Sequence, residues 1–211
     1  MSKTKLMIIL AIASYCWLAA TVILGGIFYP NYAHLSQFMS ELGATGSPHG
    51  QLVNLAGFGI TEILLLGSLA IAFQQLPKTP SNLVGFVFLA VYPILIGVAA
   101  LSPCDFECRP DTPSLSHLIH ITTALLAYLC AIIGLAFLSR QSGATKTSTL
   151  LKKSGLLLTP VLLLLFFNIV PENPIVGLVQ RVGETLIYIW LVWWLLVLAK
   201  NSGAKSTSLL K

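Results

Sequence analysis

The sequence predicts an all-α membrane protein, a polytopic bundle of six transmembrane helices that makes up a single integral membrane domain. Of its 211 residues, 56% are hydrophobic and only 9% are charged, whereas soluble domains carry about 25% charged residues. The mean hydropathy is +0.87. Runs of about 20 mostly apolar residues, the length that crosses a hydrocarbon layer about 30 Å thick, recur along the chain. Little sequence is left for a separate soluble domain.

Six apolar runs are expected to span the membrane, and each must be helical because lipid offers no hydrogen bonds to the backbone. The fifth run is the shortest, and it reaches across if flanking residues snorkel or the bilayer thins. The first run has a basic start and an Ala11-Ile12-Ala13 pattern typical of signal peptides, but it continues to Phe28, so we expect no cleavage. The spans are expected at about 6–29, 52–73, 83–101, 118–138, 154–170 and 176–198, followed by a tail over 199–211.

The basic residues predict the orientation. Ten of the twelve fall in the N-terminus, the second and fourth connections and the tail, and none of the seven acidic residues does. By the positive-inside rule both termini and the tail are then cytoplasmic. The net charge of +5 reflects this topology and attraction to anionic lipid headgroups, so we expect no nucleic-acid partner. The ten residues are Lys3, Lys5, Lys78, Arg140, Lys146, Lys152, Lys153, Lys200, Lys205 and Lys211.

Most residues capable of chemistry fall on or near the outer connections, which this topology places at 30–51, 102–116 and 171–175. All four histidines belong to this set, while two carboxyl groups and one arginine lie within the spans. The candidate ligand-binding residues are His34, Ser40, Glu41, Glu62, Asp105, His117, His120, Arg181 and Glu184.

The stretch NYAHLSQFMSELGATG in the first outer connection predicts a short amphipathic helix. Its apolar residues recur at helical spacing, while His34, Gln37 and Glu41 follow another side. Asn31 can cap its start and Gly43 can end it. It is too short to span, so we expect it in the outer interface with its apolar side toward lipid or helix ends. It either packs there as a simple interfacial helix or covers a cavity between the spans.

The charged residues inside the spans predict an ion pair or a polar cavity. An unpaired charge at this depth costs several kcal/mol. From the rise per residue, Arg181 lies about 8 Å, Glu184 about 12 Å and Glu62 about 16 Å below the outer edge. We therefore expect Arg181 to pair with Glu184 or Glu62. The pair either fixes helix packing or forms part of a substrate or ion site.

His117 and His120 lie three residues apart at the start of the fourth span and share a helix face. Both can reach one metal ion, with His34, Asp105 or Asp111 as a third ligand, in the manner of zinc sites. The spacing fits equally a pair of interfacial histidines that only form hydrogen bonds. Haem is less favoured because no histidine lies on the cytoplasmic side.

Cys104 and Cys108 in SPCDFECRPD predict a disulfide that clips the second outer connection, because extracytoplasmic compartments are oxidising. The alternative is a redox-active pair that exchanges electrons with a membrane quinone. A second mobile cysteine pair is missing, since Cys16 and Cys130 lie in apolar helices as small core residues.

Three segments, FYPNYAHLSQFMSELGATG, LSPCDFEC followed by SHLIH, and GLVQRVGETLIYIW, resemble in this order the bacterial and archaeal domain of unknown function 998 family. The resemblance covers about residues 28–190. It implies a six-helix bundle in the bacterial or archaeal cytoplasmic membrane with its distinctive residues at the outer face, and it implies no established activity. The matching residues are Ser40, Glu41, Leu42, Gly43, Pro103, Asp105, His117 or His120, Gln180 and Arg181.

Three functions are compatible with these patterns. The favoured one is binding or transport of a lipid headgroup or a small polar solute in an outward-facing polar cavity. The alternative is a membrane hydrolase, with or without zinc, that acts on a lipid of the outer leaflet; a distant likeness to alkaline ceramidases and adiponectin receptors favours it only slightly, because their late His-x-x-x-His motif is absent here. The third is thiol redox chemistry at Cys104 and Cys108. The expected partners are membrane lipids, and the oligomeric state is left open.

Overall fold

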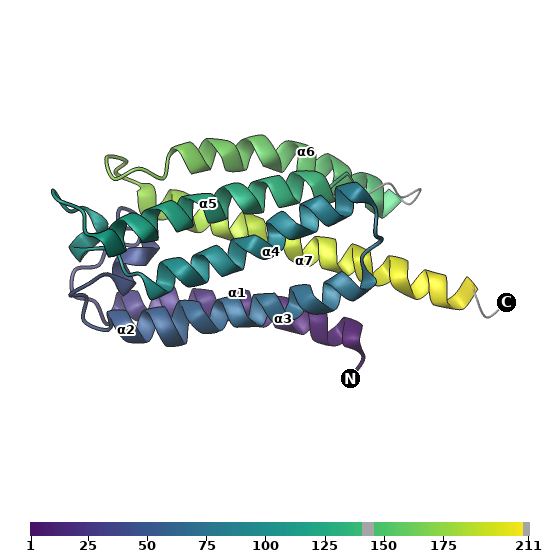
Figure 1. The fold of residues 1–211 in the computed structure, drawn as a ribbon, viewed down its shortest axis with the longest axis horizontal. Helices are drawn as coiled ribbons and strands as arrows, with labels where there is room; N and C mark the ends of the chain where they lie inside the picture. Colours follow the sequence, from purple (N-terminus) through teal and green to yellow (C-terminus); the bar gives the residue numbers. More distant parts are fainter. Residues whose placement is uncertain (141–145, 209–211) are drawn as a thin grey trace.

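The computed structural model describes the backbone of residues 1–140 and 146–208 and the side chains of residues 1–140 and 149–201. All regular structure in this part of the chain is helical, and six stretches are long and apolar enough to cross a membrane, as predicted. They are α1 (Lys3–Ile27), a continuous stretch of α2 (Gly50–Leu52), the π-helical η2 (Val53–Gly59) and α3 (Ile60–Gln75), then α4 (Pro80–Leu101), α5 (Leu115–Leu138), α6 (Lys146–Phe167) and α7 (Val176–Ser208) (Figure 1).

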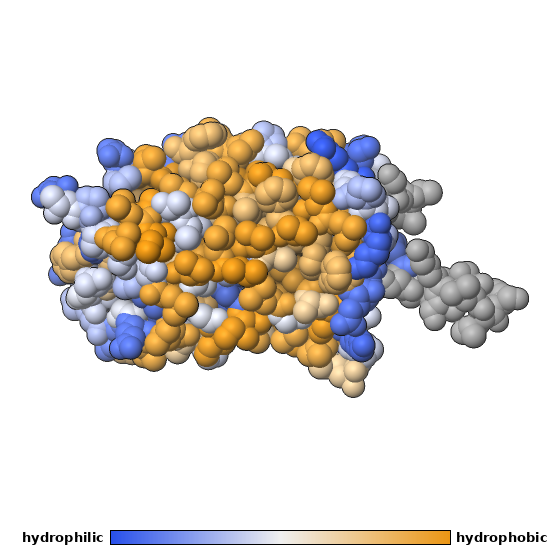
Figure 2. Space-filling view, viewed as in Figure 1, coloured by the Kyte–Doolittle hydropathy of each residue, from blue (hydrophilic) through white to orange (hydrophobic). Residues whose placement is uncertain are grey.

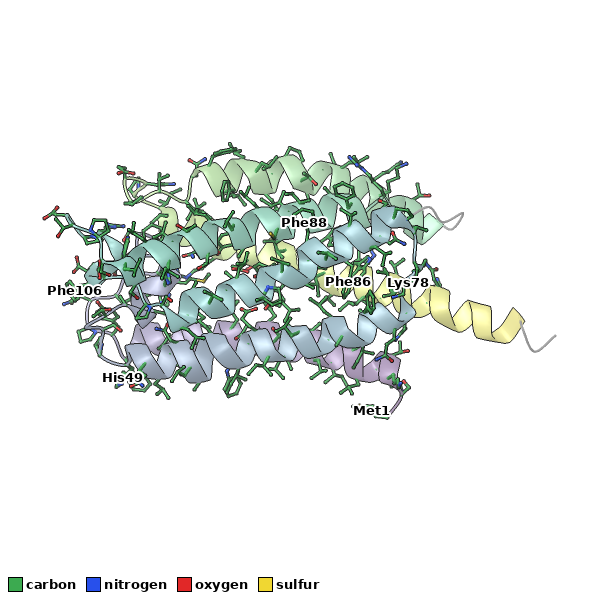
Figure 3. The ribbon with its side chains drawn as sticks, in the orientation of Figure 1. Met1, His49, Lys78, Phe86, Phe88 and Phe106 are labelled. Atoms are coloured by element: carbon green, nitrogen blue, oxygen red, sulfur yellow. A yellow bond between two sulfur atoms is a disulfide. The ribbon has the colours of Figure 1, made fainter. Side chains whose placement is uncertain are left out.

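The helices run lengthwise beside one another, and both termini lie at the same end of the bundle (Figure 1). The centre belongs to α7, which contacts α1, α3, α5 and α6. The least buried span is in α6, which packs at the edge against α5 and α7. Lys78 lies at the end of the termini, whereas His49 and Phe106 lie at the opposite end (Figure 3). We call this opposite end, formed by residues 28–49, 102–114 and 168–175, the distal end.

The surface identifies the chain as a multi-pass membrane protein. Hydrophobic residues cover the middle of the molecule, and hydrophilic residues gather toward its ends (Figure 2). Large apolar side chains such as Ile63, Leu157 and Leu164 are exposed on this belt, and an apolar surface of this extent is suited to lipid rather than water. The cytoplasmic placement of the termini stays a prediction. Of the residues on which it rests, the side chains of Lys146, Lys205 and Lys211 lie outside the described part.

Side-chain caps set where several helices begin. Ser2 Oγ accepts a hydrogen bond from the Lys5 amide at the start of α1, and Ser114 Oγ accepts one from the His117 amide at the start of α5. Thr79 caps α4 in the same way, followed by Pro80 in the first turn. These caps satisfy amide groups that no earlier turn can bond. The last helix continues to Ser208, so the residues of the expected tail up to that point are helical.

Small and hydroxyl-bearing residues hold neighbouring helices at close range. A Cβ added to Gly134 of α5 would lie 2.9 Å from the carbonyl oxygen of Gly85 of α4, so these two helices meet backbone to backbone. Between α1 and α3, Ser68 donates to the Met7 carbonyl at 2.7 Å and Ser14 donates to the Thr61 carbonyl at 2.9 Å. Such contacts are the usual means of helix association in lipid.

The first distal connection differs from the predicted amphipathic helix over Asn31–Gly43. Only Met39–Gly43 is helical, as the 3-10 helix η1, and Asn31 has a φ of 61°. Ala33 donates its amide to Gln37 Oε1 at 2.6 Å, a bond between backbone and side chain that competes with helix formation. The apolar residues Met39 and Leu42 are buried in the main core. The apolar side of this connection therefore packs against the helix ends, which was one of the two expected environments, and not against lipid.

Candidate functional site

A cavity of about 350 Å³ lies in the distal half of the bundle, between α1, α3, α4, α5 and α7. We call it the main cavity. Most of its wall is apolar, and a few polar side chains converge on it, which is typical of ligand pockets. The polar lining residues are Ser40, Glu62, His117, His120, Tyr128, Gln180 and Glu184. Five of them, all except Tyr128 and Gln180, were among the residues expected from the sequence.

Two carboxyl groups line the inner part of the main cavity. Glu184 is 5% exposed and accepts a hydrogen bond of 2.6 Å from the hydroxyl of Tyr92; Tyr128 also hydrogen-bonds to it. Glu62 is 4% exposed, and no described residue hydrogen-bonds to its Oε2 atom. The two carboxyl groups are close enough to interact electrostatically. A buried polar atom without a partner is costly, so Oε2 of Glu62 is the atom of this site that most needs a hydrogen bond from a ligand.

Gln180 and Tyr128 connect the cavity to the first distal connection. Gln180 accepts a hydrogen bond of 2.8 Å at Oε1 from the Met39 amide and donates one of 3.3 Å from Nε2 to Tyr128. Gln180 was noticed only as part of the GLVQRVG segment, and Tyr128 and Tyr92 were missed. A tyrosine in the middle of an apolar span is the only sequence signal that would have pointed to them.

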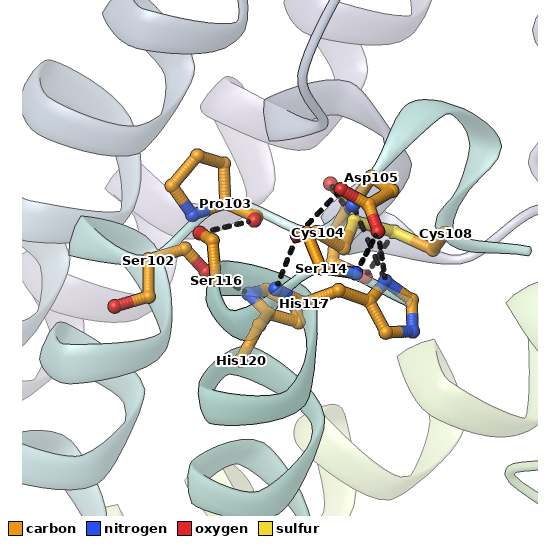
Figure 4. A network of polar contacts seen from close by, with 10 residues as sticks. Ser102, Pro103, Cys104, Asp105, Cys108, Ser114, Ser116, His117 and His120 are labelled. Atoms are coloured by element: carbon orange, nitrogen blue, oxygen red, sulfur yellow. Dashed lines mark hydrogen bonds and ion pairs between the residues drawn. A yellow bond between two sulfur atoms is a disulfide. The ribbon is translucent and has the colours of Figure 1, made fainter. Parts of the chain in front are cut away.

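The two histidines of α5 both use Nδ1 in hydrogen bonds with the backbone, but in opposite directions (Figure 4). His117 Nδ1 accepts a hydrogen bond of 3.2 Å from the Asp105 amide, so a neutral His117 carries its proton on Nε2. His120 Nδ1 lies 2.8 Å from the Ala99 carbonyl oxygen and 3.1 Å from that of Ser102. Because a carbonyl only accepts, Nδ1 of His120 carries the proton. Neutral His117 therefore offers a donor at Nε2, and neutral His120 offers an acceptor.

Asp105 does not line the cavity, and instead fixes the start of α5. Its carboxylate accepts hydrogen bonds from the Ser114 amide at 2.8 Å and the Ser114 hydroxyl at 2.7 Å (Figure 4). These bonds lower the pKa of Asp105. Its Oδ2 atom lies 4.0 Å from His117 Nδ1. Asp105 thus holds the turn that orients His117.

Arg181 does not pair with Glu184 or Glu62, contrary to the prediction. The only ion pair within 4.0 Å among the described residues is that of His117 with Asp105. The guanidinium instead donates to the carbonyl oxygens of Gln37 and Gly177 and to the hydroxyl of Tyr32. The side chain reaches toward the distal end, where carbonyl oxygens are available, as long cationic side chains do in membrane helices.

His34 and Arg181 line a second pocket, of about 270 Å³, which the histidines of α5 do not line. His34 Nδ1 lies 3.2 Å from Arg181 Nη2 and accepts a hydrogen bond from it, because arginine only donates. Burial and the charge of Arg181 lower the pKa of His34. Glu184 lines both pockets. The single cavity expected from the sequence is therefore two pockets that meet at Glu184.

Glu41 lines neither pocket, and it stabilises its own connection. It is 1% exposed and accepts hydrogen bonds from the Phe38 amide at 2.9 Å and from Gln37 Nε2 at 2.7 Å. Burial raises the pKa of its carboxyl group, and these two bonds oppose the rise. Both carboxyl oxygens of Glu41 therefore form hydrogen bonds within the connection.

Cys104 and Cys108 form the predicted disulfide, and both are buried. They pack with Phe38, Ala44 and Val176 in a small apolar cluster. Ser40 Oγ lies 3.4 Å from Cys108 Sγ at the wall of the main cavity. The disulfide therefore closes a short loop within the second distal connection and packs this loop against the first connection and the start of α7.

The metal site expected at His117 and His120 lacks a third ligand. In the part of the chain with described side chains, no group of three or more His, Cys, Asp or Glu residues is placed to hold one metal ion. His34 belongs to the second pocket, and Asp105 is bound to Ser114. Both Nδ1 atoms are engaged by the backbone, which leaves only the Nε2 atoms free for a ligand.

These features define a six-span membrane protein with a buried polar site in the distal half of its bundle. The chain belongs to the family described as Protein of unknown function (DUF998), whose model matches residues 11–197. This match confirms the resemblance found in the sequence. Comparison with curated proteins and with solved structures gave no match.

Proposed function

We propose that this protein binds an amphiphilic molecule in the main cavity. The polar part of this ligand is either the headgroup of a lipid or the polar group of a small solute. The observation that carries the proposal is a cavity of about 350 Å³ whose wall is mainly apolar and whose polar groups converge from α3, α5 and α7. Purely apolar ligands do not need such groups, and purely polar ligands do not favour such a wall. An amphiphile satisfies both parts.

The wall of the main cavity also supports entry from the membrane. The lining residues with the greatest exposure are Val170, which is 40% exposed, and Pro171. Ile121 and Leu125 of α5 line the same wall and are half-buried. We propose that a ligand enters between α5 and residues 169–171. With the termini in the cytoplasm, as the basic residues predict, this entrance faces the outer leaflet.

Ala124→Phe tests this function, because Ala124 lines the main cavity and a larger side chain there occupies its volume. We expect the variant to lose the lipid that copurifies with the protein, measured by native mass spectrometry, or to bind a spin-labelled lipid at least about tenfold more weakly. Ala20→Phe is the control, because Ala20 is exposed on α1 and does not line the main cavity. Equal lipid binding by both variants and the unmodified protein contradicts the proposal.

A membrane hydrolase acting on a lipid is the second candidate, and one observation favours it. His117 and His120 line one cavity and offer a donor and an acceptor at Nε2, as a general acid and a general base require. Hydrolysis of a fluorogenic lipid ester that is lost in His117→Gln and His120→Gln, but retained in the exposed His49→Gln, supports it. No turnover by the unmodified protein contradicts it, and the zinc content of the purified protein tests the metal-dependent version.

A further inference from the structure

The main cavity contains two carboxyl groups and no basic side chain of the protein other than its histidines. Glu184 is supplied with hydrogen bonds by Tyr92 and Tyr128. Glu62 is only 4% exposed, and no described residue forms a hydrogen bond with its Oε2 atom. An ionised carboxylate at this depth needs a counter-charge. No residue that the structure describes supplies one to Glu62 within the cavity.

The nearest candidate for a counter-charge is already engaged. Arg181 donates its terminal nitrogens to Tyr32, Gln37, His34 and Gly177, and no carboxylate lies within 4.0 Å of it. It lines the second pocket and not the main cavity. The charges near Glu184 are thus one cation and two carboxyl groups, so at most one carboxylate is balanced by the described residues. Glu62 is therefore either protonated or balanced by a cation from outside the described part of the chain.

The lining of the cavity favours an organic cation over a metal ion. No described group of three or more suitable ligands surrounds Glu62, whereas a divalent ion such as Ca²⁺ takes six to eight oxygen ligands. The wall around Glu62 is apolar and includes the aromatic side chains of Phe58 and Tyr128. Aromatic faces attract organic ammonium groups, and a primary ammonium can donate to a carboxylate and a phenol at once.

We infer that the ligand of the main cavity carries a protonated amine, which donates a hydrogen bond to Glu62 and places its apolar part along the wall formed by α5. The inference rests on the proposed function, and it names the chemical class of the polar part. The amine belongs either to a lipid headgroup or to a small soluble molecule, because both present the same group to Glu62.

The test compares two ligands that differ only in the amine. Octylamine and octanol are titrated into the purified protein in non-ionic detergent at neutral pH, and binding is measured by calorimetry. We expect octylamine to bind at least about tenfold more tightly than octanol, because its bond to a carboxylate is charge-assisted and desolvated. Equal affinities overturn the inference and leave the proposed function standing. Failure of both ligands to bind overturns both.

Variants identify the carboxylate. Glu62→Gln keeps the size of the side chain and should remove the preference for octylamine while octanol still binds. Glu172→Gln is the matched control, because Glu172 is exposed in the connection beside the proposed entrance and does not line the cavity. A preference that survives in Glu62→Gln overturns the assignment. If Glu62→Gln does not fold, the comparison of octylamine with octanol in the unmodified protein still decides between the outcomes above.

A third titration, with ethylamine, separates the two sources of the amine. Affinity for ethylamine close to that for octylamine supports the bond between the amine and Glu62 with a small soluble ligand, and contradicts the placement of an apolar part along the wall. Much weaker binding of ethylamine supports it with an amine-bearing lipid, because the apolar wall then contributes most of the affinity.

Discussion

Arg181 Nη2 donates a hydrogen bond of 2.6 Å to the hydroxyl oxygen of Tyr32, and this bond ties α7 to the first distal connection. The tyrosine hydroxyl in turn donates to the Phe38 carbonyl at 2.8 Å. Burial raises the pKa of Tyr32 to about 12, although the nearby Arg181 opposes the rise. The phenol therefore keeps its proton, and its hydroxyl group links Arg181 to the backbone of the connection through two hydrogen bonds.

Arg181→Gln is expected to lower the free energy of unfolding by at least about 2 kcal/mol, because it removes several hydrogen bonds to a charged group. Tyr32→Phe removes one of them and should cost less, about 1 to 2 kcal/mol. Denaturant unfolding in detergent measures both. An Arg181→Gln protein of unchanged stability that loses ligand binding would assign Arg181 to the ligand instead.

The contact between His34 and Arg181 is expected to weaken in acid. His34 Nδ1 accepts a hydrogen bond from Arg181 only while the imidazole is neutral. Burial and Arg181 lower its pKa below the ordinary 6.5, so the contribution of His34 to stability is complete above that value and decreases as the pH falls through the pKa in the folded protein. The measurement is the melting temperature between about pH 8 and pH 5.

His34→Gln is the comparison for this pH dependence. The glutamine retains a hydrogen-bond acceptor and does not titrate. Its melting temperature should therefore decrease less over the same range than that of the unmodified protein. Parallel curves for the two proteins would show that His34 does not carry the effect.

Gly177→Ala is expected to separate the first distal connection from α7. A Cβ at this position would overlap the carbonyl oxygens of Gln37 and His34, which are backbone atoms. We expect a loss of about 1 to 3 kcal/mol in the free energy of unfolding. Gly183→Ala is the control on the same helix, because nothing lies within 4 Å of its added Cβ. That variant should be unchanged or slightly more stable, since alanine favours helix more than glycine does.

Removing the disulfide in Cys104→Ser/Cys108→Ser is expected to cost about 2 kcal/mol, because the closed loop is short and constrains the unfolded chain little. Thermal unfolding with and without a reductant measures this cost, and the variant should not respond to the reductant. The same variant tests redox chemistry: if quinone-linked thiol oxidation occurs in the unmodified protein and ends in the variant, the cysteines act as more than a clip.

The spans were predictable because each one is a continuous apolar segment of the sequence that is long enough to cross the membrane. The structure confirms six of them, and even the weak fifth run forms a helix that ends at Phe167. The amphipathic helix was not predictable with the same rule. The periodicity around Met39 and Leu42 is real, but Gln37 and Tyr32 bond to the nearby backbone and leave only a short 3-10 helix.

The residues that line the main cavity were predictable only in part, and so was their arrangement. Ser40, Glu62 and Glu184 were selected as polar residues in or beside apolar spans, and they line the main cavity. The predicted ion pair of Arg181 was wrong, because the depth of a residue along its helix does not tell which neighbouring helix its side chain faces. Tyr92 and Tyr128 were missed because an aromatic residue in a span is unremarkable until its hydroxyl is seen beside a carboxylate.

The sequence by itself determined that this chain crosses the membrane six times and that its histidines and acidic residues gather toward one end, because both properties depend on composition and order along the chain. Only the tertiary structure decided that Arg181 turns to the first distal connection and that Glu62 is left without a hydrogen bond at Oε2 in the main cavity. The reason is physical: hydropathy fixes the depth of a residue, whereas the rotation and close packing of helices fix its neighbours.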